Sequence, residues 1–222
     1  MNDSIRAIPA RAGSALTTNR VLKNTYLLLA LTLGFSALTA MASMALEMSP
    51  MTYLIAVIAS MVLGIFVLPR TANSAAGIGV IFLITGLLGF GLGAILSIYL
   101  SLPKGPQIVA TAFGGTGVIF LGLSAYALTS KRDFSFMGGF LVAGMIGVVV
   151  LMLANLFFQL PILSLAISAV ILLLMSGFIL FDTSRIINGG ETNYIMATYG
   201  IYLSIFNIFI SLLNILGLTS DD

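Results

Sequence analysis

One acidic residue stands inside a long apolar segment in the last quarter of the chain. Asp182 occurs in the stretch ILFDTSR, and Arg185 follows three residues later, on the same face if the segment is helical. A charge at the centre of a bilayer costs about 2.5–3.5 kcal/mol, and less near a helix end, so such residues usually face other protein groups. The pattern predicts an ion pair of Asp182 with Arg185 or Arg70. The alternative is an interfacial acid that reaches water and has no role.

A second polar group lies in the apolar segment that follows. Four small polar residues recur there at spacings of three and four, which places them on one face of a helix. They are Ser204, Asn207, Ser211 and Asn214. Such a face turns inward, because lipid cannot satisfy its polar groups. Two interpretations remain: hydrogen bonds between helices, or the lining of a cavity that Asp182 closes.

The chain lacks the residues that most enzyme mechanisms require. The chain contains no Cys and no His, which excludes a Ser–His pair and the usual zinc sites. An intramembrane aspartyl protease needs two facing carboxylates, and Asp182 is the only acid inside a late apolar run. Gly114-Gly115-Thr116-Gly117 resembles a phosphate-binding loop but has no following Lys and no preceding strand. We therefore expect no enzyme activity, cofactor, metal site or nucleic-acid partner.

The composition of the chain predicts that membrane-spanning helices position these residues. Of 222 residues 59% are apolar and only 7% charged, whereas soluble domains carry about a quarter charged residues. The mean hydropathy is +1.16. Seven apolar runs have the length of about 20 residues that crosses a bilayer, at 25–46, 51–68, 76–100, 107–129, 137–158, 162–183 and 196–217. The chain is predicted to be an all-α integral membrane protein, a bundle of seven transmembrane helices.

Orientation follows from the basic residues in the short connections. With the N-terminus in the cytoplasm, eight Lys and Arg residues lie inside and only Lys104 lies outside. The inside set is Arg6, Arg11, Arg20, Lys23, Arg70, Lys131, Arg132 and Arg185. This predicts a flexible basic cytoplasmic tail at 1–24, a transmembrane domain at 25–218 and a short external C-terminus at 219–222. The first run is too long for a cleaved signal peptide, so we expect an uncleaved anchor.

Two stripes of small residues predict close helix packing. Thr85, Gly89, Gly93 and Ser97 repeat every four residues in the third run, and Gly139, Ala143 and Gly147 do so in the fifth. Small residues at this spacing let helix backbones approach closely in a membrane.

Four stretches carry a family resemblance. They are RVLKNTYLLLALTL at 20–33, KRDFSFMGGFLVAG at 131–144, ILFDTSRIINGGETNYIMA at 179–197 and YLSIFNIFISLLNILG at 202–217. The chain resembles the Bax inhibitor-1 (TMBIM) family, and within it the bacterial YccA-type branch. The resemblance covers essentially everything after the tail, and GGETNY is its most specific part.

The resemblance implies two functions. Members of the YccA-type branch are inner-membrane partners and modulators of the membrane-anchored AAA protease FtsH, which can also draw in their N-terminal tails. Other members of the family are similar to pH-sensitive calcium leak channels gated by two aspartates and an arginine. By position, Asp182 matches the first aspartate and Arg70 the arginine. The second aspartate falls at Ser204, so a latch of two neighbouring carboxylates cannot form.

We therefore expect a non-enzymatic, multi-pass protein of the bacterial inner membrane. Its partners would be the lipid bilayer and FtsH, and it would affect the turnover of membrane proteins. The alternative is a calcium or proton leak channel of the Bax inhibitor-1 type with Asp182 as the titrating group.

Overall fold

The computed structural model describes residues 7–130 and 132–219, and it is all helical in these ranges. The elements are α1 (Ala7–Ala45), α2 (Met51–Val62), the π-helix η1 (Leu63–Val67), α3 (Leu68–Thr71), α4 (Ala75–Leu100), α5 (Gly105–Ser130), the 3₁₀-helix η2 (Ser135–Met137), α6 (Gly138–Phe158), α7 (Pro161–Ile187) and α8 (Tyr194–Thr219). Seven segments of the described chain are long and apolar enough to cross a membrane, because α2, η1 and α3 form one continuous span. The predicted bundle of seven spans is confirmed.

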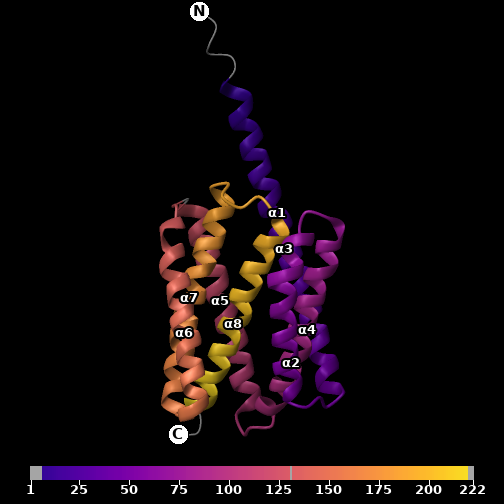
Figure 1. The fold of residues 1–222 in the computed structure, drawn as a ribbon, viewed down its shortest axis with the longest axis vertical. Coiled ribbons are helices and arrows are strands. Elements are labelled where there is room, and N and C mark those ends of the chain that lie inside the picture. Colours follow the sequence, from indigo (N-terminus) through magenta and orange to yellow (C-terminus); the bar gives the residue numbers. More distant parts are fainter. Residues whose placement is uncertain (1–6, 131, 220–222) are drawn as a thin grey trace, which may run out of the picture.

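The two ends of the described chain lie at opposite ends of the bundle, as an odd number of spans requires (Figure 1). The end from which α1 projects also carries the α7–α8 loop and the basic residues Arg70, Arg132 and Arg185. We call it the basic end. The opposite end, which we call the C-terminal end, holds the α4–α5 loop with Lys104.

The first helix begins well before residue 25, the predicted start of the transmembrane domain. It starts at Ala7, and its membrane-spanning part covers Thr17–Ala45. Val21 is buried in the main apolar cluster, and Thr25 is fully buried. The predicted boundary between the tail and the transmembrane domain, at residue 24, therefore falls inside α1. The apolar run was predicted to begin at residue 25 because residues 17–20 are polar, although the next helical turn packs into the bundle.

The second span contains a π-helical turn, and Pro69 explains its position. Proline has no backbone N–H, so it cannot continue the α-helical ladder behind it. The chain widens at Leu63–Val67, where Leu68 N–H bonds to Leu63 O, five residues back. Gly64 in this turn faces α8, because a side chain there would collide with the hydroxyl of Tyr199. The turn thus keeps the span helical up to Thr71.

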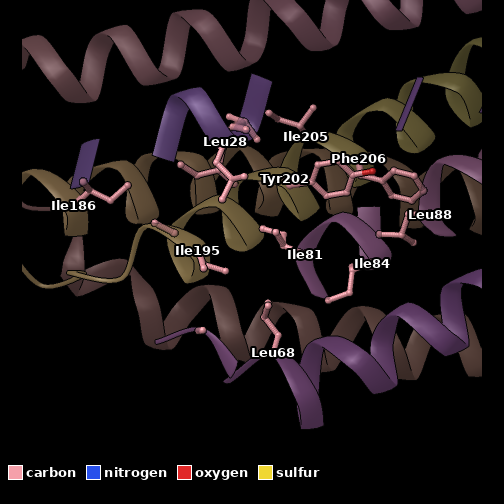
Figure 2. Packing of buried hydrophobic residues seen from close by; sticks show 14 of the residues in the cluster. Leu28, Leu68, Ile81, Ile84, Leu88, Ile186, Ile195, Tyr202, Ile205 and Phe206 are labelled. Atoms are coloured by element: carbon pink, nitrogen blue, oxygen red, sulfur yellow. The ribbon is translucent and has the colours of Figure 1, made fainter. Parts of the chain in front are cut away.

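Helix α8 occupies the middle of the bundle. It packs against α7, α5, α1 and α4, and it is the most buried of the seven spans. Figure 2 shows part of the main cluster, in which Leu28 of α1 and Ile81 and Ile84 of α4 meet Tyr202 of α8. A second cluster joins α6 and α7 around Leu141 and Ile179.

The two small-residue stripes behave differently. On α4, a side chain at Gly89 would collide with the carbonyl of Ser36 and one at Gly93 with that of Ala40, so this stripe packs directly on α1 as predicted. On α6, Gly139 and Gly147 are exposed, and a Cβ atom there would meet nothing within 4 Å. Helix α6 instead packs on α7 through Gly138 and Gly144, which face Phe181 and Leu174.

Candidate functional site at the basic end

Asp182 lies on α7, five residues before that helix ends at Ile187. Its carboxylate rests against Gly200 of α8: a Cβ atom at Gly200 would lie 2.7 Å from Asp182 Oδ2. The missing side chain at position 200 makes the room that the acid occupies. Asp182 is half-buried and stands near the end of its span, as predicted from the sequence.

The structure does not form the expected ion pair of Asp182 with Arg185 or Arg70. The guanidinium of Arg185 lies 3.6 Å from the carboxylate of Glu191 and donates to the Gly190 carbonyl at 3.3 Å. The exposed Arg70 donates to the carbonyl of Phe66 in its own span. Among the described residues no salt bridge of Asp182 is present. The reason is local: the α7–α8 loop folds back and offers Arg185 a nearer acid.

Asn193 organises that loop and was not singled out from the sequence. Its carboxamide oxygen accepts from the backbone N–H groups of Ile195 at 2.9 Å and Met196 at 3.1 Å, which caps the start of α8. Its amide nitrogen donates to the Ala72 carbonyl at 3.0 Å and to Asn73 Oδ1 at 2.8 Å. One side chain therefore ties the last helix to the α3–α4 turn. An Asn before a long apolar run was the available signal for the cap, but nothing in the sequence indicated its second contact.

Ser184 of α7 holds a second loop at this end of the bundle. Its hydroxyl accepts from Phe134 N–H at 2.9 Å and donates to the Arg132 carbonyl at 3.1 Å. These bonds hold the α5–α6 connection against α7. Beside it, Asp133 Oδ1 accepts from Ser135 N–H at 2.9 Å, and hydrogen bonds with Ser135 lower the pKa of this exposed carboxyl from its ordinary 3.8.

The predicted stripe on α8 divides into two groups. Ser204 is 2% exposed and donates to Gly200 O, and Asn207 donates to Leu203 O, each within its own helix. Asn214 donates to Ser164 at 3.0 Å and to Ser168 at 2.7 Å, both on α7. Ser211 is also buried. Of the two interpretations of this stripe, Asn214 fits hydrogen bonding between helices. Ser204 lies one helical turn after Gly200, the glycine that Asp182 contacts.

Two further interhelical contacts were missed. The Tyr202 hydroxyl lies 2.6 Å from that of Ser36 and donates to the Thr85 carbonyl at 3.3 Å, which joins α8 to α1 and α4. Thr198 donates to the carbonyl of Thr25 at 3.2 Å. Tyr and Thr in an apolar run carry no periodic signal that distinguishes them from ordinary core residues.

The arrangement holds helices together, and Asp182 is the acid that lies within a membrane-spanning helix at this end of the described chain. In residues 7–130 and 132–219, His, Cys, Asp and Glu do not gather in groups of three or more that could hold a metal ion. A cleft of about 330 Å³, lined by Asn155, Gln159, Ser164 and Leu218 among others, lies at the C-terminal end and not beside Asp182.

Comparison with known proteins identifies the family. The family described as "Inhibitor of apoptosis-promoting Bax1" matches residues 18–221. The chain is 53% identical over 209 residues, 94% of each chain, to the Escherichia coli protein named "Modulator of FtsH protease YccA", which in a second strain is named an inner membrane protein. It is 52% identical over 207 residues, 93% of each chain, to an uncharacterised membrane protein of Vibrio cholerae. These relatives are named for modulation or membrane location and not for an enzyme activity. With its seven apolar helices, the chain is a multi-pass inner-membrane protein, and it belongs to the Bax inhibitor-1 family.

Proposed function

We propose that this protein is a non-enzymatic partner of the membrane AAA protease FtsH and that it modulates the turnover of membrane proteins. The observation that carries the proposal is its 53% identity to a relative named as a modulator of that protease. The match covers 94% of both chains, so it extends over nearly the whole length of the relative.

The structure supplies a feature that suits such a partnership. Helix α1 continues for ten residues before its membrane-spanning part, over residues 7–16, which is about 15 Å at 1.5 Å per residue. Figure 1 shows this extension standing clear of the bundle at the basic end. With the basic end in the cytoplasm, as the positive-inside rule favours, the extension points toward an ATP-driven protease that works there. In this orientation residues 219–222 lie outside.

Co-purification and protein half-life test the proposal. We expect the intact chain to co-purify with FtsH from detergent-solubilised membranes and to slow or redirect degradation of a membrane substrate. Removal of residues 1–16 should lengthen the protein's half-life in cells with active protease, while insertion is retained because Arg20 and Lys23 remain. Removal of residues 220–222, at the other end of the chain, is the matched control and should leave the half-life unchanged. Failure to co-purify would contradict the partnership. An unchanged half-life after removal of residues 1–16 would contradict the extension as the point of engagement.

A further inference from the structure

The cleft at the C-terminal end of the bundle opens where α6, α7 and α8 meet. In Figure 1 the turn between α6 and α7 and the last turn of α8 lie together at the end marked C. The volume of about 330 Å³ is at the lower end of the range of about 300–1,000 Å³ that small-molecule sites occupy, so the cleft has room for a small polar group. Three polar and three apolar side chains line most of it: Asn155, Gln159, Ser164, Leu156, Leu160 and Leu218.

Gln159 lines the cleft from a backbone conformation that favours glycine. It follows the last residue of α6 with φ of 48° and ψ of 41°, in the left-handed region. Glycine adopts this conformation without steric cost and is the usual residue at this position of a helix end. Among the described residues, no hydrogen bond fixes the Gln159 carboxamide. The chain thus places a free carboxamide in the cleft at a cost in backbone strain.

Asn155 and Ser164 are held by protein contacts that leave their donor groups free. The carboxamide oxygen of Asn155 accepts from Leu160 N–H at 3.0 Å, so its amide nitrogen remains as a donor. The Ser164 hydroxyl accepts from Asn214 at 3.0 Å, and its own O–H donates to none of the described residues. Together with Gln159, these side chains offer the cleft two amide groups and one hydroxyl as donors, and none of the three carries a charge.

The cleft lies at the level where two spans leave the hydrocarbon of the membrane. One span ends at Phe158 and the next begins at Pro161. Large apolar side chains next to the lining residues in the chain face outward, since Phe157 is 87% exposed and Ile162 is 82% exposed. The polar groups of the cleft therefore stand at the level of the lipid headgroups, beside an apolar surface that acyl chains cover.

We propose that the cleft between α6, α7 and α8 binds the glycerol phosphate region of a phospholipid from the membrane leaflet at this end. Phosphodiester and ester oxygens only accept hydrogen bonds, so they match the donors of Asn155, Gln159 and Ser164. The cleft takes the polar region, and the acyl chains remain in the bilayer along the exposed side of α6. Because the cleft opens at the first turn of α7, the helix dipole adds to the preference for the negative phosphate.

Native mass spectrometry and thermal unfolding of the delipidated protein in detergent test the site. Phosphatidylglycerol and phosphatidylethanolamine share the glycerol phosphate, so one molecule of either should stay bound and raise the unfolding midpoint. Inorganic phosphate at the same concentration should leave the midpoint unchanged, because it has no acyl chains to hold it. The absence of a rise with both lipids would overturn the proposal. A rise with inorganic phosphate alone would also overturn it, since the cleft would then bind the free ion.

Gln159→Gly separates lipid binding from stability. Without lipid, its unfolding midpoint should equal or exceed that of the parent, since glycine adopts a φ of 48° without strain. Its lipid affinity should fall about fivefold, which corresponds to the loss of one typical hydrogen bond. Glu47→Gly is the matched control: Glu47 also has a positive φ, of 50°, but lies outside the cleft, so this variant should keep the parental affinity. Equal affinities of the two variants would contradict a role of Gln159 in the site.

Asn155→Asp tests the direction of the hydrogen bonds. The acid keeps an acceptor for Leu160 N–H but replaces the donor nitrogen by an oxygen that repels phosphate, so lipid affinity should fall further than in Gln159→Gly. Gln107→Glu makes the same amide-to-acid change at an exposed position near the start of α5, at the same end of the bundle but outside the cleft, and should bind lipid as the parent does. An equal loss in both variants would mean that surface charge repels lipid without a site, and the proposal would fail.

Discussion

At the scale of single residues, the contact between Asp182 and Gly200 predicts which substitutions of Ser204 the bundle tolerates. Ser204 is buried one turn beyond Gly200 on α8, so an acid there would stand near the Asp182 carboxylate. Two neighbouring carboxylates repel each other when both are ionised. We expect Ser204→Asp to lower the unfolding midpoint more at pH 8 than at pH 6. Ser204→Asn, similar in size but uncharged, should show no such difference. Equal pH dependence in the two variants would place Asp182 too far away to interact.

Asp133 gives a second prediction at this scale. Hydrogen bonds with Ser135 lower its pKa below 3.8, so its contribution to stability is present above that value and is lost as the pH falls through the lowered pKa. We expect Asp133→Ala to be less stable than the parent at pH 7, with the difference shrinking toward pH 3. Asp133→Asn keeps an acceptor for Ser135 N–H and should show a smaller loss at pH 7, which also shrinks as the carboxyl of the parent becomes protonated. Thermal unfolding followed by circular dichroism measures both. A difference between Asp133→Ala and the parent that stays constant with pH would contradict the capping role.

At the scale of helices, the glycines of α4 and α6 form a matched pair. Gly89→Ala places a methyl group against the Ser36 carbonyl on α1, and overpacking of this kind costs about 1–3 kcal/mol. Gly147→Ala meets nothing within 4 Å and gains about 0.5–1 kcal/mol of helix propensity. We therefore expect Gly89→Ala to lower the unfolding midpoint in detergent and Gly147→Ala to leave it unchanged or raise it. Equal effects would mean that α1 and α4 are not in backbone contact.

The helices themselves were the most predictable part of the fold. Length and hydropathy identify seven spans because the bilayer demands that each span satisfy its own backbone. The start of α1 was misplaced since Thr17 and Arg20 are polar although Val21 packs in the core. The ion pair of Arg185 with Glu191 could not be predicted, because helical periodicity relates Arg185 to Asp182 but says nothing of where the following loop places Glu191. The Asn193 contact with Asn73 spans 120 residues, a separation about which local pattern carries no information.

At the scale of the whole molecule, the distribution of charge predicts the orientation. Lys104 is the only basic residue assigned to the C-terminal end, whereas Arg70, Arg132 and Arg185 stand at the basic end. We expect a reporter fused after Asp222 or inserted beside Lys104 to be active only outside the cytoplasm. A reporter inserted beside Arg132 should be active only inside. Cytoplasmic activity of the fusion after Asp222 would contradict the N-in, C-out arrangement.

The central position of α8 has a consequence for how the chain is made. Ribosomes deliver a polypeptide from its first residue to its last, yet the helix that α1, α4, α5 and α7 surround is the final one. Until Tyr194–Thr219 has entered the bilayer, the six earlier spans lack the surface on which four of them pack. Helices inserted in a membrane can associate after each is formed, so α1 can pair with α4 and α6 with α7 before α8 arrives, but these pairs lack the helix that joins them. A nascent chain halted before residue 194 would therefore be inserted with its early helix pairs formed, but the bundle would not be closed.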